Sequence, residues 1–310
     1  MTSEVYKAQV RLLVRTLPYV AAEDCFALKG GTAINLFIRD MPRFSVDIDL
    51  AYLPVAGRAG SLAAIQAALL RIKAAIEAGI QGSHVTSATT APENKIVKLM
   101  VSIPGAQIKI EANPVLRGSV YPAVELSVSA SVEDEFGFAA MQVLSFADLY
   151  GGKLVAAMDR QHPRDLFDAR DLLRNEGVNQ DLERAFLVHL ISHKRPAAEI
   201  LACRRKAIAD EYENNFKGMT VEEVPLADLA AVRDTLVDVL VRGMPDAHRK
   251  LLLSIEQGAP DWTLLPIENV PTLPAVLWRL QNIAGLTDAQ RADNAAKLQA
   301  VFERSDKGEA

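Results

Sequence analysis

The stretch of residues 26–50, FALKGGTAINLFIRDMPRFSVDIDL, constrains the fold of this chain more than any other part of its sequence. A short apolar run ends at Gly30 and Gly31, a helical pattern follows, and a strand pattern of period two begins after Pro42. Paired glycines allow a turn with positive φ and a close approach of the backbone to another group. The stretch therefore predicts strand, turn, helix and strand, with 26–29 as the first strand.

The second strand of this stretch places acidic and apolar side chains on opposite faces. Ser45, Asp47 and Asp49 alternate with apolar residues, and residues two apart on a strand point to the same side. Two carboxylates repel each other unless a cation lies near them, and hard oxygen ligands suit Mg²⁺ or Mn²⁺ together with substrate phosphates. The helix after the glycines, which Thr32 is expected to cap, presents N–H groups that favour a phosphate. Each signal alone is weak, but their order favours a phosphate site followed by a metal site.

The composition fits a globular protein of one large or two ordinary domains. The chain has 310 residues, 50% of them apolar and 24% charged. Its net charge of −5 argues mildly against broad wrapping of nucleic acid, although a local basic patch is compatible with it. No signal-peptide pattern and no uninterrupted apolar run near the length of a membrane span is present, so we expect a cytoplasmic protein without a membrane partner.

A third carboxylate is a candidate partner for the acidic strand. Residues 107–112 follow a Pro-Gly turn and alternate in polarity, with Glu111 on the polar side. Glu111 is expected either to join the two aspartates in a metal site or to be a solvated glutamate paired with Lys109 or Lys95. The sequence leaves both interpretations open, because separation along the chain says nothing about distance in space.

A second informative stretch, residues 145–173, predicts two helices separated by a break at 161–163. Lys153 interrupts the apolar face of the first helix, where a lysine either reaches solvent or meets an anion. The glycine pair just before it destabilises a helix by about 1 kcal/mol per residue, which indicates that another group approaches the backbone there. Asp165 lies at the start of the second helix, where a carboxylate also satisfies the helix dipole.

Beyond Asn179 the sequence is helical in pattern to its end. Thr287 and the prolines at 196, 225 and 274 are plausible helix starts. The main basic cluster comprises residues 193–195 and 204–206. This cluster is either a solvated surface or a site that grips an RNA backbone.

The motifs in these stretches resemble the AbiEii family, which includes the MenT toxins of type IV toxin–antitoxin and abortive-infection systems. The resemblance rests on KGGTA…RFSVDIDL, on LYxxKxxA and RxxxRDxxD around Lys153 and Asp165, and on NNFKGMT further along, so it spans nearly the whole chain. It implies an α+β nucleotidyltransferase fold. Residues 1–143 would form a core with a mixed sheet, flanking helices and an N-terminal support helix. Residues 144–310 would form a helical domain that contributes Lys153 and Asp165 to the site.

The same resemblance implies the residues of the site. Catalytic roles are implied for Ser45, Asp47, Asp49, Lys153 and Asp165. Nucleotide contacts are implied for Lys29, Gly30, Gly31, Thr32, Arg43, Ser45 and Lys153. Metal ligation is implied for Asp47 and Asp49, with Glu111 as a third candidate. Asp165 would act as a base or as an orienting group.

The activity that the resemblance implies is transfer of a nucleotide from an NTP to the 3′ end of tRNA, which would block translation. An AbiEi-like antitoxin would be the protein partner. In MenT-like relatives the serine that matches Ser45 can be phosphorylated, and a phosphate there would repel both carboxylates and the NTP. Two alternatives stay open: an NTP:small-molecule nucleotidyltransferase of the aminoglycoside-modifying kind, and a catalytically silent binding protein.

Overall fold

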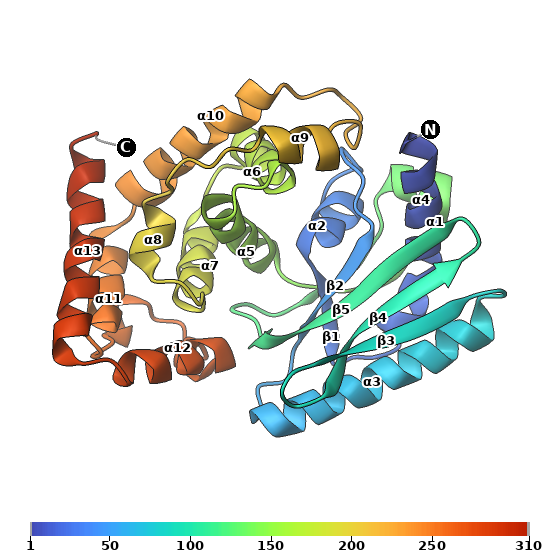
Figure 1. Cartoon of the computed structure of the whole chain (residues 1–310), viewed down its shortest axis with the longest axis horizontal. Helices are drawn as coiled ribbons and strands as arrows, with labels where there is room; N and C mark the ends of the chain where they lie inside the picture. Colours follow the sequence, from blue (N-terminus) through green and yellow to red (C-terminus); the bar gives the residue numbers. More distant parts are fainter. Residues whose placement is uncertain (1, 309–310) are drawn as a thin grey trace. The chain divides into compact units, whose positions relative to one another are not determined.

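The computed structural model describes residues 2–308 and divides into two compact units. The first unit comprises Met1–Leu149 and Gly218–Glu223, and the second comprises Tyr150–Lys217 and Val224–Ala310. The division falls within helix α5 (Phe146–Asp159), whose first residues belong to the first unit. Figure 1 labels helices α1–α13 and strands β1–β5 along the chain.

The first unit contains a seven-stranded mixed sheet with helices packed against it. Its strands are β1 (Phe26–Lys29), β2 (Asp47–Tyr52), β3 (His84–Thr90), β4 (Lys95–Ile103), β5 (Ala106–Arg117), β6 (Val124–Ser127) and β7 (Ala140–Val143). Its helices are α1 (Thr2–Ala21), α2 (Gly30–Ala33), the π-helix η1 (Ile34–Ile38), α3 (Arg58–Gly79) and α4 (Ala130–Phe136). The mixed sheet and its helices confirm the α+β class expected from the sequence.

Strand β2 lies in the middle of the sheet, whose order is β3-β4-β5-β2-β1-β7-β6. It pairs antiparallel with β1 and parallel with β5, while β1 pairs parallel with β7. Ile48 and Leu50 of β2 are fully buried, as the alternating pattern predicts. The polar positions of the same strand, Asp47 and Asp49, are only partly buried. The acidic strand is therefore a central strand with one apolar face and one charged face.

The residues just before β2 do not join the sheet. A strand from Phe44 was expected, but β2 begins at Asp47. Arg43 instead forms an antiparallel bridge with Thr220, and the Phe44 N–H donates to the carbonyl of Met219 at 2.8 Å. The segment that returns to the first unit from far along the chain thus pairs with the residues that lead into the acidic strand.

Two long helices cover the sheet. Helix α1 packs on β5 and β7 and buries Val10, Leu13 and Leu17. Helix α3 packs mainly on β4 and has the length and composition of a membrane span, with 39% of its apolar window buried. Such a helix is weak evidence for a membrane, because the core helix of a globular unit passes the same test.

The second unit consists of helices and loops, and its described residues include no strand. Its helices are most of α5, then α6 (Pro163–Asn175), α7 (Gln180–Ile191), α8 (Ala197–Leu201), α9 (Ala209–Asn215), α10 (Leu226–Val237), η2 (Asp238–Arg242), α11 (Asp246–Glu256), η3 (Trp262–Leu264), η4 (Val270–Thr272), α12 (Pro274–Ala284) and α13 (Asp288–Asp306). The helical pattern beyond Asn179 is confirmed. Thr287 caps α13 in a capping box, and Pro274 begins α12, as their positions in the sequence predict.

Candidate active site

The turn after β1 brings together side chains that are separate in the sequence. Gly30 has a φ of +75°, in the left-handed region that favours glycine. A Cβ atom on Gly30 would lie 2.8 Å from Asp49 Oδ2. A Cβ atom on Gly31 would lie 2.7 Å from Arg43 Nη2 and 2.9 Å from Ser45 Oγ. The glycines therefore make room for a carboxylate, a guanidinium and a hydroxyl directly against the backbone.

Thr32 does not cap the helix, contrary to the expectation. Helix α2 begins at Gly30, and Lys29 precedes it without a side-chain cap. The hydroxyl of Thr32, which is 1% exposed, donates to the backbone carbonyl of Asp47 and lies 3.0 Å from Ser45 Oγ. Because this hydroxyl donates its hydrogen bond to β2, it links the glycine turn to the acidic strand instead of capping the helix.

Replacing Gly31 by alanine is expected to lower the free energy of unfolding by about 1–3 kcal/mol, because the added methyl group overpacks a site with little room. Arg43 is 2% exposed and Ser45 is 8% exposed, so neither side chain can move freely away. Urea denaturation measures the change. Gly60→Ala in α3 is the matched control, because a Cβ there meets nothing within 4 Å and is expected to be neutral or stabilising. Equal stability of both variants would contradict the close packing at the turn.

A row of charged residues crosses four strands of the sheet. Asp49 is paired in register with Lys29 of β1 and with Glu111 of β5, and Glu111 is paired with Lys98 of β4. Residues directly opposite each other on neighbouring strands project to the same face. The register therefore gives the charged face of β2 a lysine on one side and a glutamate on the other.

Lys109 is a residue of this face whose contact with the acidic strand the sequence analysis missed. Its Nζ lies 3.0 Å from Glu111 Oε2 and 3.8 Å from Asp47 Oδ2. Burial alone would lower the pKa of Lys109, but the surrounding carboxylates outweigh it and raise that pKa. The alternation of residues 107–112 places Lys109 on the polar face, whereas its approach to Asp47 depends on the pairing of β5 with β2.

Glu111 takes part in two ion pairs. Its carboxylate lies 3.0 Å from Lys109 Nζ and 3.4 Å from Lys98 Nζ. Burial would raise the pKa of Glu111, but the two lysines together hold it below its usual value. The expected pairing with Lys109 is present, and the same glutamate lies opposite Asp49 in the sheet.

The carboxylates of β2 fit a hard divalent cation that takes its remaining ligands from a substrate and from water. Asp47 and Asp49 supply carboxylate oxygens from one face of a strand. Within residues 2–308 no group of three His, Cys, Asp or Glu side chains is arranged to hold a metal ion. Mg²⁺ commonly takes only one or two carboxylates and completes its shell with phosphates and water, so two aspartates are a sufficient protein contribution.

A second charged group lies in the helical unit. Lys153 of α5 places its Nζ 2.7 Å from Asp165 Oδ1 and 2.9 Å from Asp168 Oδ2, both on α6. The three side chains are 7%, 2% and 1% exposed, respectively. The anion that the sequence predicted for Lys153 is therefore supplied at least in part by the chain itself. The sequence assigned Asp168 no secure role, and here it is the second partner of the lysine.

Asp165 is held as a carboxylate by two cations. Burial would raise its pKa, but Lys153 and Arg160 together keep that pKa well below the usual range. Arg160 also donates from Nη2 to Asp165 Oδ1 at 3.0 Å. Both oxygens of this carboxylate already accept hydrogen bonds from Lys153 and Arg160, so the geometry favours the orienting role over the base role.

The glycine pair before Lys153 is explained by close helix packing. A Cβ on Gly151 would lie 2.8 Å from the backbone N of Phe186 in α7. A Cβ on Gly152 would lie 3.5 Å from the ring of His189, also in α7. The group that approaches this backbone is therefore α7, which lets α5 present Lys153 to α6.

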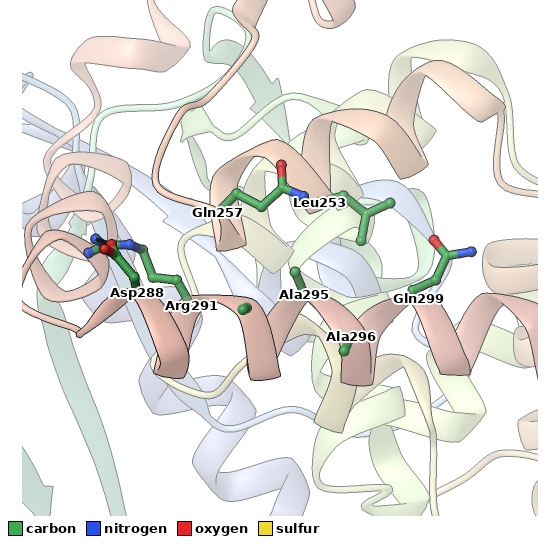
Figure 2. A pocket seen from close by; sticks show the side chains of 8 residues that line it. Leu253, Gln257, Asp288, Arg291, Ala295, Ala296 and Gln299 are labelled. Carbon is green, nitrogen blue, oxygen red and sulfur yellow. Dashed lines mark hydrogen bonds and ion pairs between the residues drawn. The ribbon is translucent and has the colours of Figure 1, made fainter.

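A groove of the helical unit carries none of these residues. Its volume is about 510 Å³, and it runs between α11 and α13. Figure 2 shows Leu253 and Gln257 on one wall and Ala295, Ala296 and Gln299 on the other. The acidic residue of its described lining, Asp288, pairs with Arg291 one turn along the same helix, and no second carboxylate and no glycine turn lie among the lining residues, so we place the chemistry elsewhere.

The structure thus gathers the candidate residues in two groups. The group in the first unit contains Lys29, Gly30, Gly31, Thr32, Arg43, Ser45, Asp47, Asp49 and Glu111. The group in the second unit contains Lys153 and Asp165, with Arg160 and Asp168. Each group is internally connected by contacts that the structure describes.

Comparisons with known proteins identify the family and the fold of this chain. The family model of the nucleotidyl transferase AbiEii toxin of type IV toxin–antitoxin systems matches residues 11–282. MenT4, a nucleotidyltransferase toxin from Mycobacterium tuberculosis, is similar in structure with a TM-score of 0.60 and 14% sequence identity, over 96% of this chain and 93% of that chain. At this identity the likeness shows a shared fold. The comparison with curated protein sequences gives no match. Because the family match covers well over half of its length, the chain belongs to the AbiEii family of nucleotidyltransferase toxins of type IV toxin–antitoxin systems.

Proposed function

We propose that this toxin transfers a nucleoside monophosphate from an NTP to the 3′ end of tRNA and thereby blocks translation. The observation that supports transfer most strongly is the glycine turn packed against Ser45 and Asp49, on a strand that also carries Asp47. Binding of a triphosphate requires backbone that its oxygens can approach and positively charged side chains. The attacking hydroxyl requires carboxylates nearby that can hold a metal ion. This face of the first unit combines all of these groups.

In the proposed reaction the acceptor hydroxyl loses its proton to water, its oxygen attacks the α-phosphorus, the bond between the α-phosphorus and the bridging oxygen breaks, and pyrophosphate leaves. Gly30 and Gly31 would let the phosphates approach the backbone, with Lys29 and Arg43 supplying positive charge. Ser45 would donate its hydroxyl to a phosphate oxygen. The work of the protein is mainly positioning and charge neutralisation, as is usual for transfer of phosphoryl-type groups.

Asp47 and Asp49 would hold a divalent metal ion, Mg²⁺ or Mn²⁺. When bound there, such an ion neutralises phosphate charge and lowers the pKa of the acceptor hydroxyl. Lys153 would add positive charge for the nucleotide, since an ammonium has three N–H donors and two carboxylates account for only two of them. Asp165 and Asp168 would orient it. An AbiEi-like antitoxin would be the protein partner that counteracts the toxin.

The test incubates the purified chain with each of four labelled NTPs, Mg²⁺ and total tRNA. Label on tRNA and release of pyrophosphate are expected, and chelation of the metal with EDTA is expected to abolish both. Translation of a reporter with the treated tRNA is expected to fall in proportion to the label. Label on a small molecule instead of tRNA would contradict the proposed acceptor, and no label on any acceptor would contradict the proposed reaction.

A further inference from the structure

The helical unit contains a second cavity whose lining is strongly basic. It has a volume of about 380 Å³ and lies among α8, α10, η2 and α13. Aliphatic side chains form part of its wall. Its charged lining residues are Arg204, Arg205, Arg233, Asp234 and Arg304. Four guanidinium groups against one carboxylate give this cavity a positive potential.

The positive charge of this cavity is only partly neutralised by the chain. Arg205 pairs with Asp234 at 2.7 Å, and both side chains are more than half exposed. In the part of the chain that the structure describes, Arg204 and Arg304 form no ion pair. Burial raises the pKa of the Cys203 thiol to about 11, so this lining residue adds no negative charge near neutral pH.

A buried hydroxyl at the cavity is without a partner. Ser305 lines the cavity and is 5% exposed, and its Oγ makes no hydrogen bond with any residue in 2–308. Its backbone carbonyl accepts a hydrogen bond from Arg242 Nε at 3.0 Å, so the residue is held in place. A buried hydroxyl without a partner is unfavourable, and a ligand in the cavity that accepts its hydrogen after the Ser305 side chain rotates about χ1 would remove the penalty.

The loop that carries the arginines is held rigidly by one glutamine. Gln161, which is fully buried, donates from Nε2 to the carbonyl of Arg204 at 2.9 Å. Its Oε1 accepts from the backbone N of Lys206 at 3.0 Å and from Arg233 Nη1 at 3.2 Å. Gln161 itself belongs to the turn between α5 and α6, with a φ of +54°. The anion site is thus preorganised, and the turn that shapes it joins the helices of the Lys153 group.

We propose that this basic cavity binds a phosphate group. Guanidinium groups match phosphate oxygens in geometry and charge, and the serine hydroxyl can donate a further hydrogen bond. The phosphate would come from the backbone of the acceptor RNA or from a free nucleotide. The RNA source rests on the proposed function, because the cavity would then anchor the acceptor while its 3′ end reacts.

The experiment measures equilibrium binding to the full chain without any NTP. Fluorescein-labelled tRNA is titrated and followed by anisotropy, and CMP and inorganic phosphate are titrated by calorimetry. The double variant Arg204→Ala with Arg304→Ala is expected to bind tRNA about tenfold more weakly and with a salt slope reduced by about one. Arg174→Ala is the matched control, since it removes an exposed arginine of the same unit outside the cavity.

The variant Ser305→Ala separates a ligand role from a structural role. Removing a buried hydroxyl that lacks a partner is expected to leave the melting temperature equal or higher. Binding of the same phosphate ligand is nevertheless expected to weaken severalfold. A lower melting temperature with unchanged binding would show that the hydroxyl serves only the fold and would contradict its place in the site.

The outcomes distinguish the phosphate source from the proposed reaction. Weaker tRNA binding with unchanged CMP binding supports a backbone phosphate, and the reverse supports a free nucleotide. Unchanged binding of all three ligands by the double variant would overturn the phosphate site. A chain that transfers nothing to tRNA and still shows these binding losses would support the cavity and contradict the proposed acceptor.

Discussion

Replacing Asp49 by asparagine is expected to slow nucleotidyl transfer by about a thousandfold or more, with little change in the fold. The carboxylate lies against Gly30, in register between Lys29 and Glu111, on the charged face of β2. An amide of the same shape cannot supply the negative charge that a divalent ion requires, and loss of a preorganised charge in such a site typically costs two to three orders of magnitude or more. Pyrophosphate release at saturating NTP and metal measures the change.

Asp134→Asn is the matched control for this variant, because it removes an exposed carboxylate of α4 in the same unit. Its transfer rate is expected to stay within about twofold of the unchanged protein, as for a surface substitution. Cells that express the Asp49 variant are expected to grow, whereas cells that express the control are expected to arrest. Undiminished toxicity of the Asp49 variant would exclude catalysis at this face as its cause.

The variant Glu111→Gln decides between the two interpretations of the third carboxylate. If Glu111 is a metal ligand, its substitution would slow nucleotidyl transfer nearly as much as substitution of Asp49. As a partner of Lys98 and Lys109 alone, it contributes a partly exposed ion pair, and its loss would change the rate only severalfold. The two lysines that now contact it favour the smaller effect.

Features set by neighbouring residues could be predicted from the sequence. The period of two around Asp47 and Asp49, the glycine turn and the helix start at Thr287 depend on contacts over a few residues. Local patterns of this kind encode element type and the face to which a side chain points. The alternation therefore identified the charged face of β2, although it placed the start of the strand too early.

Contacts that join distant segments could not be predicted in the same way. Thr32 was expected to cap the helix after the glycines, but the pairing of β1 with β2 brings its hydroxyl to the Asp47 carbonyl. The bridge between Arg43 and Thr220 links residues far apart in the chain. A single sequence specifies side-chain chemistry at each position, whereas strand register and segment pairing follow from the packing of the whole unit.

Replacing Lys153 by methionine is expected to lower the free energy of unfolding by about 3–5 kcal/mol. The substitution leaves two carboxylates, on Asp165 and Asp168, buried without the ammonium that lies within 2.9 Å of both. Breaking a buried ion pair by removing one partner typically destabilises by this amount, because the remaining charge stays uncompensated. Urea denaturation followed by circular dichroism measures the loss.

The control for Lys153 is Lys297→Met in α13, which breaks a pair whose side chains are 65% and 59% exposed. A surface pair of this kind contributes about 0–1 kcal/mol, so the control is expected to be close to neutral. Equal effects of the two substitutions would contradict a buried charge cluster in the helical unit.

A double variant separates the structural role of Lys153 from its proposed contact with the nucleotide. Adding Asp168→Asn to Lys153→Met removes one of the two carboxylates that lost the ammonium, so part of the lost stability is expected to return in a non-additive way. Transfer activity is not expected to return with it, because the neutral methionine still offers nothing to the triphosphate. Recovery of activity together with stability would mean that Lys153 serves the fold alone, and the nucleotide contact would then have to be assigned to the lysine and arginine of the first unit.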